Sequence, residues 1–246
     1  MKKVVAYLTT GYPDPAFCTD LSLELARSGV DAIELGIAFS DPVADGALIE
    51  KANHLALERG FKFAHALEVA SAIAPSIDTL FMGYFNSFYQ QDLQSIVTKA
   101  SKIKLKGFII PDLPYEESQA YADLFETHNL ANIAFVAPTD TKDRIATLVK
   151  DAKEFIYLVA YAGITGSAKS EDLTSIIAHI REASNTPIYV GFGVNRHTAR
   201  QKAKGVDGVI VGSAFIEILL DDSLNFTQKI AHCKELANII KSEINA

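Results

Sequence analysis

Short, nearly continuous apolar runs recur along the whole chain, and segments with helical periodicity separate them. The eight runs cover residues 4–9, 32–36, 79–84, 107–112, 132–138, 155–160, 187–193 and 208–214. Runs of this kind are typical of parallel strands that are buried on both faces of a sheet. The pattern therefore predicts parallel strands that are joined by crossover helices.

Capping signals indicate where the helices between the strands begin and end. Asp14 followed by Pro15 is a favourable start, because Asp caps a helix and Pro suits the first helical position. Gly29 can end that helix. Further helices are predicted over residues 116–128, 142–151, 173–184 and 226–244.

The number of strands favours a closed barrel. Eight strands that alternate with helices can form a (β/α)8 barrel, and 246 residues is an ordinary length for one. We therefore predict an α/β fold, a single TIM-barrel domain over residues 1–246. An open doubly wound sheet is the alternative, but the first strand-to-helix turn, TTGYPDP, lacks the glycine fingerprint of a dinucleotide site.

Composition narrows the class of protein. The formal net charge of −7 argues against nucleic-acid binding, which depends on Lys and Arg. No apolar run reaches the roughly 20 residues that span a bilayer, and the first one is too short for a signal peptide. Cys18 and Cys233 are far apart and the six histidines are scattered, so we predict no metal site and a reducing, cytoplasmic setting.

In a TIM barrel the chemistry lies at the carboxyl ends of the strands and in the loops that follow them. Glu34 lies near the end of the second predicted strand, inside the otherwise apolar stretch IELG. Side chains alternate along a strand, so Glu34 shares the inward face with the small residues Ala32 and Gly36. A carboxyl group there suits acid–base chemistry, and pairing with a Lys, Arg or Tyr is the structural alternative.

Two more carboxylates follow in the loop FSDPVADG. Asp41 precedes Pro42 and is typical of a turn, and Asp45 could be a turn residue or the N-cap of the next helix. Together with Glu34, these residues would place three carboxylates over one barrel mouth. That grouping favours a functional role over three separate structural ones.

Glycine-rich segments occur after the last three strands, at residues 163–166, 191–193 and 211–213. Glycine lets backbone N–H groups approach an anion, and GSAFIEILL predicts a short helix whose N-terminus attracts one. We therefore predict a phosphate site, which overall acidity does not exclude. The aromatic residues Tyr84, Tyr157 and Phe192 lie near the same mouth and would suit a flat apolar ring, with core packing as the alternative.

Six motifs, in order, resemble the tryptophan synthase α subunit family over nearly the whole chain. They are LTTGYPD, IELGIAFSDPVADG, IIPDLPYEES, YLVAYAGITG, VGFGV and VIVGSA. The resemblance implies a lyase of tryptophan biosynthesis that cleaves indole-3-glycerol phosphate to indole and glyceraldehyde 3-phosphate without a cofactor. It also implies a β-subunit partner, in a heterotetramer of two α and two β subunits, with pyridoxal phosphate held by the β subunit.

The resemblance implies roles for single residues as well. Glu34 and Asp45 match the family's catalytic acids, and Tyr157 matches a tyrosine of the catalytic site. The positions that match substrate or phosphate contacts are Tyr84, Gly166, Phe192, Gly193, Gly212 and Ser213. The positions in loops that communicate with the β subunit are Asp41, Asp112 and Pro114.

Ala38 and Ala47 depart from the family's pattern, in or beside the loop that signals to the β subunit. Ala38 replaces a usual proline and should leave the free loop more mobile. Two other functions stay open: another phosphate-binding barrel enzyme, such as a sugar-phosphate isomerase or epimerase, and a non-catalytic regulatory subunit. The pair of acids, Glu34 and Asp45, favours the lyase over both.

Overall fold

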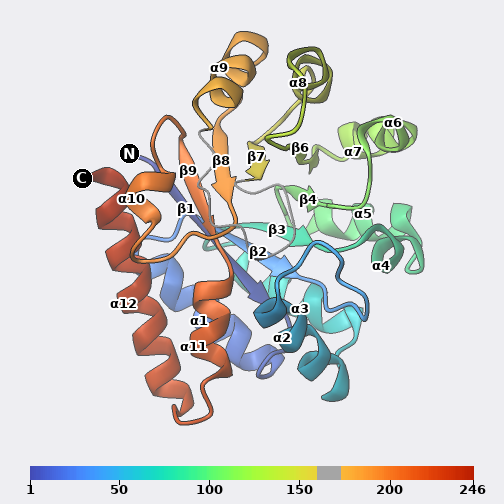
Figure 1. The fold of residues 1–246 in the computed structure, drawn as a ribbon. Helices are drawn as coiled ribbons and strands as arrows, with labels where there is room; N and C mark the ends of the chain where they lie inside the picture. The colour runs from blue at the N-terminus through green and yellow to red at the C-terminus, as the bar shows by residue number, and fades with distance from the viewer. Residues whose placement is uncertain (160–172) are drawn as a thin grey trace.

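A parallel sheet wraps around the centre of the molecule in the computed structural model, which describes residues 1–159 and 173–246 (Figure 1). The strands are β1 (Lys3–Thr9), β2 (Ala32–Gly36), β3 (Asp78–Met82), β4 (Gly107–Ile109), β5 (Ala131–Asn132), β6 (Ala134–Val136), β7 (Ile156–Val159), β8 (Ile188–Gly191) and β9 (Gly208–Val211). Every pairing between them is parallel. The predicted strands are therefore confirmed, with shorter bounds at most carboxyl ends.

The fifth predicted strand is divided into two short strands, β5 and β6, and together they close the barrel. The strand order is β5-β4-β3-β2-β1-β9-β8-β7-β6, so its two ends are the consecutive segments β5 and β6. Ile133 separates them, and its N–H still donates to the Phe108 carbonyl at 2.9 Å, on the β4 side. The chain then shifts its pairing to β7. One continuous segment thus joins both ends of the sheet, which confirms the predicted TIM barrel.

Helices surround the sheet. They are α1 (Pro15–Arg27), α2 (Ala47–Glu58), α3 (Phe63–Ile73), α4 (Phe85–Tyr89), α5 (Leu93–Lys102), α6 (Tyr115–Ser118), the 3₁₀ helix η1 (Gln119–Tyr121), α7 (Ala122–Thr127), α8 (Lys142–Val149), α9 (Thr174–Ala183), α10 (Ala199–Lys202), α11 (Ser213–Leu220) and α12 (Phe226–Asn245). Among the described residues, none of these helices combines the length and apolarity that a membrane span needs.

Two of the helix predictions show what local sequence can and cannot define. Asp14 caps α1 by accepting a hydrogen bond from the Phe17 N–H at 2.9 Å, as predicted. The single helix predicted over residues 116–128 is wrong, because the chain forms α6, η1 and α7 there. The backbone of Tyr121, the last residue of η1, departs from α-helical geometry, with φ −114° and ψ 2°. Its ring packs against the Phe85 ring, with 5.3 Å between the ring centres.

The alternation along β2 divides its side chains between two apolar layers. Ile33 and Leu35 belong to the large core between the sheet and the helices. Ala32 belongs to a smaller cluster inside the barrel, which also contains Leu80 and Ile210. Glu34 lies two residues beyond Ala32 on the same face of the strand, so it lies above this inner cluster near the carboxyl end of the barrel.

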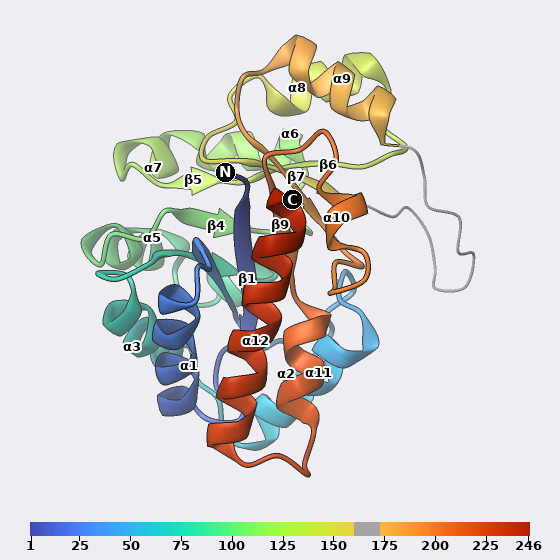
Figure 2. The ribbon, with the colours of Figure 1, turned by 90° about the vertical axis from the view of Figure 1, so that its left-hand side faces the viewer.

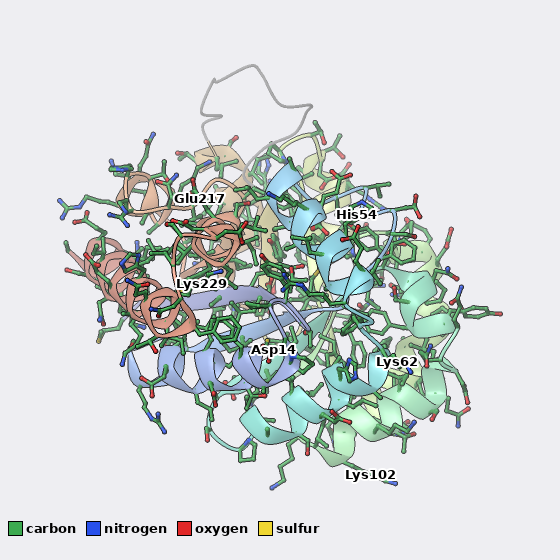
Figure 3. All side chains as sticks on the ribbon, turned by 90° about the horizontal axis from the view of Figure 1, so that it is seen from below. Asp14, His54, Lys62, Lys102, Glu217 and Lys229 are labelled. Carbon is green, nitrogen blue, oxygen red and sulfur yellow. The ribbon has the colours of Figure 1, made fainter. Side chains whose placement is uncertain are left out.

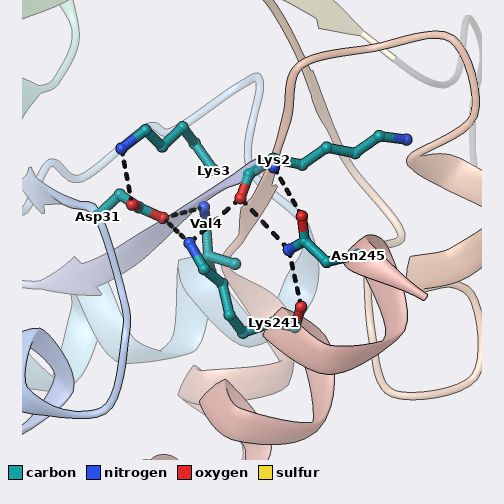
Figure 4. Close-up of polar contacts among 6 residues, drawn as sticks. All are labelled: Lys2, Lys3, Val4, Asp31, Lys241 and Asn245. Carbon is teal, nitrogen blue, oxygen red and sulfur yellow. Dashed lines mark hydrogen bonds and ion pairs between the residues drawn. The ribbon is translucent and has the colours of Figure 1, made fainter.

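A network of polar contacts links the start of β1 to the end of α12 at the amino end of the barrel (Figure 4). Its members are Lys2, Lys3, Val4, Asp31, Lys241 and Asn245. The Asp31 carboxylate, before β2, accepts from the Val4 N–H at 2.8 Å and pairs with Lys241 of α12. The Lys2 N–H donates to the Asn245 side chain at 2.7 Å, so the two ends of the chain lie together (Figure 2).

At the opposite end, α2 and α11 lie side by side (Figure 2). Both helices follow directly on a loop from a strand, rather than returning along the outside of the sheet. Figure 3 views the molecule from this side, with His54 on α2 and Glu217 on α11 labelled. The two helices therefore build up one rim of the barrel mouth.

Candidate active site

A cavity of about 220 Å³ opens at the carboxyl ends of the strands, beside α2 and α11. It brings together most of the residues predicted for the site: Glu34, Asp45, Tyr157, Phe192, Gly193, Gly212 and Ser213. Tyr84, Asp41, Asp112 and Pro114 are not among its lining residues. Gly166 lies outside the described residues. A larger cavity of about 610 Å³ lies beside α6, α7 and α8, and neither Glu34 nor Asp45 lines it.

Glu34 is a buried carboxyl group, with 2% of its surface exposed. Its Oε1 atom has no hydrogen-bond partner among the residues that the structure describes. Burial, with a further contribution from the nearby charge of Asp45, raises the pKa of Glu34 to about 8. Glu34 therefore carries a proton at neutral pH and can exchange it with a group bound in the cavity.

Asp45 lies on the loop just before α2, and the structure excludes the helix-cap alternative. Gly46 is the N-cap of α2, and no side chain caps that helix end. The Asp45 carboxylate instead accepts a hydrogen bond from Asn53 Nδ2 at 3.3 Å and another from the Tyr84 hydroxyl. Burial raises the pKa of Asp45 to about 6, although these two hydrogen bonds oppose the rise. Asp45 is thus largely ionised at neutral pH.

Tyr84 lies behind Asp45 rather than on the cavity wall. Its hydroxyl accepts a hydrogen bond from the Ala44 N–H at 2.9 Å, and its ring stacks on Phe39 at 5.3 Å between ring centres. Both contacts join the segment after β3 to the loop that follows β2. Tyr84 therefore fixes the loop that carries Asp45.

Tyr157 on β7 forms an aromatic wall inside the barrel. Its ring stacks on Phe135 at 4.8 Å and meets Phe192 edge-on at 6.1 Å between ring centres. A Cβ atom at Gly191, on the neighbouring strand, would overlap the Tyr157 hydroxyl. The cavity thus has a flat apolar side opposite its carboxyl groups, which suits an aromatic ring.

Sequence reasoning did not single out several residues that line the cavity. They include Tyr7, Ile49, Met82, Asn195, Ile210 and Glu217. Tyr7 is paired in register with Glu34 on the adjacent strand. Its position was open to prediction, because alternation along VVAYLT places Tyr7 on the same face as Val5, inside the barrel. Ile49 and Glu217 depend on how α2 and α11 pack, which periodicity does not define.

The rim formed by α11 and the loop after β8 fits an anion. Gly212 is the N-cap of α11, and the first two residues of the helix, Ser213 and Ala214, line the cavity, so their N–H groups lie beside it. A Cβ at Gly212 would meet the Ile49 side chain at 3.2 Å. Phe192 and Gly193 are consecutive residues with positive φ, 71° and 69°, which turns the backbone sharply beside the cavity. These features support the predicted phosphate site.

The predicted partner loops are connected to one another. Asp112 Oδ1, after β4, accepts a hydrogen bond from the Phe85 N–H at 2.7 Å, at the start of α4. Asp41 is exposed and accepts from the Ser40 hydroxyl at 2.5 Å, and Pro114 precedes α6. Because Tyr84 also holds the loop after β2, the loops after three neighbouring strands form one connected surface.

Metal ligands are not grouped in the described part of the chain. No set of three or more His, Cys, Asp or Glu side chains within residues 1–159 and 173–246 is arranged to hold a metal ion.

Comparisons with known proteins agree on one family. The family model described as tryptophan synthase alpha chain matches residues 1–245. The tryptophan synthase alpha chain of Wolinella succinogenes is 51% identical, over 100% of this chain and 97% of that protein. The solved tryptophan synthase subunit alpha of Campylobacter jejuni has a TM-score of 0.86 and 35% identity, over 96% of this chain and 95% of that one. A solved tryptophan synthase from Mycobacterium tuberculosis has a TM-score of 0.89 and 30% identity, over 100% and 93%.

Proposed function

The chain belongs to the tryptophan synthase alpha chain family. From this premise we propose how the residues of its cavity cleave indole-3-glycerol phosphate. The protein is an indole-3-glycerol-phosphate lyase of tryptophan biosynthesis. The observation that carries the proposal is the pair of acids in one cavity, with the protonated Glu34 and the ionised Asp45 in different environments. Acids whose pKa values are pushed apart are suited to different tasks in one reaction.

Glu34 moves the protons. Cleavage breaks the bond between indole C3 and the glycerol chain, C3 must gain a proton, and the glycerol hydroxyl must lose one. The neutral carboxyl group of Glu34 delivers its proton to C3, and the resulting carboxylate takes the hydroxyl proton as the carbon–carbon bond breaks. A pKa of about 8 suits a group that must both give and take a proton near neutral pH.

Asp45 stabilises the charge that develops on the ring. Protonation at C3 leaves positive charge at the indole nitrogen, and a fixed carboxylate beside that N–H favours this state over the ground state. The role fits a group that is largely ionised and held by two neutral donors, Tyr84 and Asn53. Tyr157 and Phe192 would hold the ring between these acids.

The substrate phosphate would bind at the rim of the cavity. Backbone N–H groups at Gly212 and Ser213, with the turn at Gly193, supply donors at the start of α11. Gly166 stays part of this proposal from the sequence alone. The reaction needs no further cofactor in this chain, since its steps are proton transfers and charge stabilisation.

A tryptophan synthase β subunit is the proposed partner, in a heterotetramer with two copies of each subunit. The connected loops after β2, β3 and β4, which carry Asp41, Asp112 and Pro114, would meet it. Two large apolar side chains support this surface, because 86% of Val43 and 62% of Tyr89 are exposed.

We also propose that residues 1–246 form a single domain and that the protein is cytoplasmic. The buried free thiols of Cys18 and Cys233 fit a reducing compartment.

The deciding experiment measures indole release from indole-3-glycerol phosphate, with and without a β subunit. We expect slow release by this chain alone and faster release with the β subunit, because docking would cover the barrel mouth and exclude water. Consumption of a sugar phosphate without any indole would favour an isomerase or epimerase. No indole under either condition would favour a regulatory subunit.

A further inference from the structure

Asn53 on α2 is a buried amide in contact with Asp45. Its Nδ2 lies 3.3 Å from Asp45 Oδ2, and 1% of the residue is exposed. Its Oδ1 is buried without a hydrogen-bond partner among the described residues. An unpaired buried acceptor destabilises a fold, so the contribution of Asn53 to folding does not account for a polar side chain here.

The contact with Asp45 defines the orientation of the amide. An ionised carboxylate can only accept hydrogen bonds, so Asn53 must present its NH2 group to Asp45. Turning the amide over would place Asn53 Oδ1 against Asp45 Oδ2, two acceptors that cannot form a hydrogen bond, and would remove the donor from Asp45. The amide therefore donates to Asp45, and Oδ1 is left buried without a partner among the described residues.

The other groups around Asp45 are acidic or neutral. Glu34 from β2, Tyr7 from β1 and Tyr157 from β7 line the same cavity. Glu50, on the first turn of α2, adds a further negative charge that opposes ionisation of Asp45. Glu217 lines the cavity from α11. Among the described residues of the cavity lining, none is Lys or Arg.

A neutral donor has an advantage over a cation at this position. A Lys or Arg would neutralise Asp45 and compete with the positive charge that develops on the substrate ring. A buried amide keeps the carboxylate in place without cancelling its charge. The Tyr84 hydroxyl is neutral as well, so both groups that hold Asp45 leave its charge available to the substrate.

We propose that Asn53 is a positioning residue, which keeps Asp45 ionised and directed into the cavity during cleavage. The inference rests on the proposed role of Asp45 and extends it to a residue in the second turn of α2. Asn53 itself does not line the cavity, so it acts on the reaction only through Asp45.

The test measures the pH dependence of indole release, with a β subunit present, for wild type and Asn53→Leu. Leu has a similar size but cannot donate a hydrogen bond. We expect kcat to fall roughly ten- to a hundredfold with little change in KM, and the acidic limb of the kcat profile to move to higher pH. Ala56→Gly is the matched control, because it weakens the same helix one turn further on without removing a donor to Asp45.

A double-mutant comparison separates positioning from folding. In an Asp45→Asn background, Asn53→Leu should have no further effect on kcat beyond about twofold, because the group it positions is gone. Asn53→Asp is the second variant if Asn53→Leu fails to fold, and two carboxyl groups at this site should move the acidic limb even further. If neither variant folds, Asn53 is structural and the proposal is wrong.

The experiments distinguish failure of the positioning role of Asn53 from failure of the proposed function. Wild-type kcat and an unmoved acidic limb in folded Asn53→Leu would overturn the positioning role while leaving the lyase assignment intact. Absence of indole release by the wild type, or full activity of Asp45→Asn, would instead overturn the proposed function on which the inference rests.

Discussion

The ring of Tyr7 lies over Gly36, so closely that a Cβ atom at position 36 would overlap the Tyr7 hydroxyl and ring. Tyr7 belongs to β1 and Gly36 to the end of β2, two residues beyond Glu34, with which Tyr7 is paired in register. Tyr157 and Gly191 repeat the arrangement between β7 and β8. In each case a glycine on the neighbouring strand gives a tyrosine room to reach toward the cavity.

This contact predicts that Gly36→Ala destabilises the protein by roughly 1–3 kcal/mol, the usual cost of overpacking a filled core. The added methyl group must displace Tyr7, so indole release should fall as well. Denaturant unfolding measures the first effect. Gly46→Ala is the steric control, because a Cβ there meets no atom within 4 Å and only the N-cap of α2 is weakened. A loss of stability in Gly36→Ala no larger than that in Gly46→Ala would show that Tyr7 moves aside freely.

Glu34→Gln should reduce indole release by at least about a hundredfold while the protein stays folded. The amide fits the space of the carboxyl group but cannot exchange a proton with the substrate. Steady-state kinetics together with circular dichroism measure both properties. A folded variant that keeps near wild-type turnover would remove Glu34 from the mechanism.

The same substitution should change how stability depends on pH. Burial raises the pKa of Glu34 from 4.5 to about 8, so between these values the unfolded chain loses a proton that the folded chain keeps. The stabilising contribution of the protonated group is complete below about pH 4.5 and is lost as the pH rises to about 8. Glu34→Gln removes this loss, so its stability relative to wild type should rise across this window, by at most about 1.4 kcal/mol per pH unit. A difference that stays constant from pH 5 to pH 8 would contradict the buried, protonated state.

The pH–rate profile of the wild type should be bell-shaped. Asp45 must be ionised, so activity falls as the pH drops below about 6, and Glu34 must be protonated, so activity falls above about 8. Asp45→Asn should lower kcat more than it changes KM and should remove the acidic limb. An unchanged acidic limb in Asp45→Asn would assign that limb to another group.

The sequence was sufficient to predict the barrel because short β-rich runs alternate with helical segments, and each run overlaps a strand of the structure. It did not predict the division at Ile133, which depends on pairing with two different neighbours. Glu34 was predictable because a carboxyl group in an apolar run stands out. Asn53 was not, because the distance between it and Asp45 depends on how the loop turns before α2.

The proposed phosphate site predicts that a substitution at Gly212 weakens binding of the glycerol phosphate part of the substrate but not of its indole part. Gly212→Val places a branched side chain where a Cβ alone already meets Ile49 at 3.2 Å, and it crowds the first N–H groups of α11. Binding of glycerol 3-phosphate, measured by calorimetry, should weaken at least about tenfold, because each lost hydrogen bond to a charged group has an effect of this size. Binding of indole, which has no phosphate, should stay close to wild type. Gly212→Ala is the milder control, since the end of the Ile49 side chain can move aside. Equal weakening of both ligands by Gly212→Val would mean that the whole cavity has collapsed, and unchanged binding of glycerol 3-phosphate would place the phosphate elsewhere.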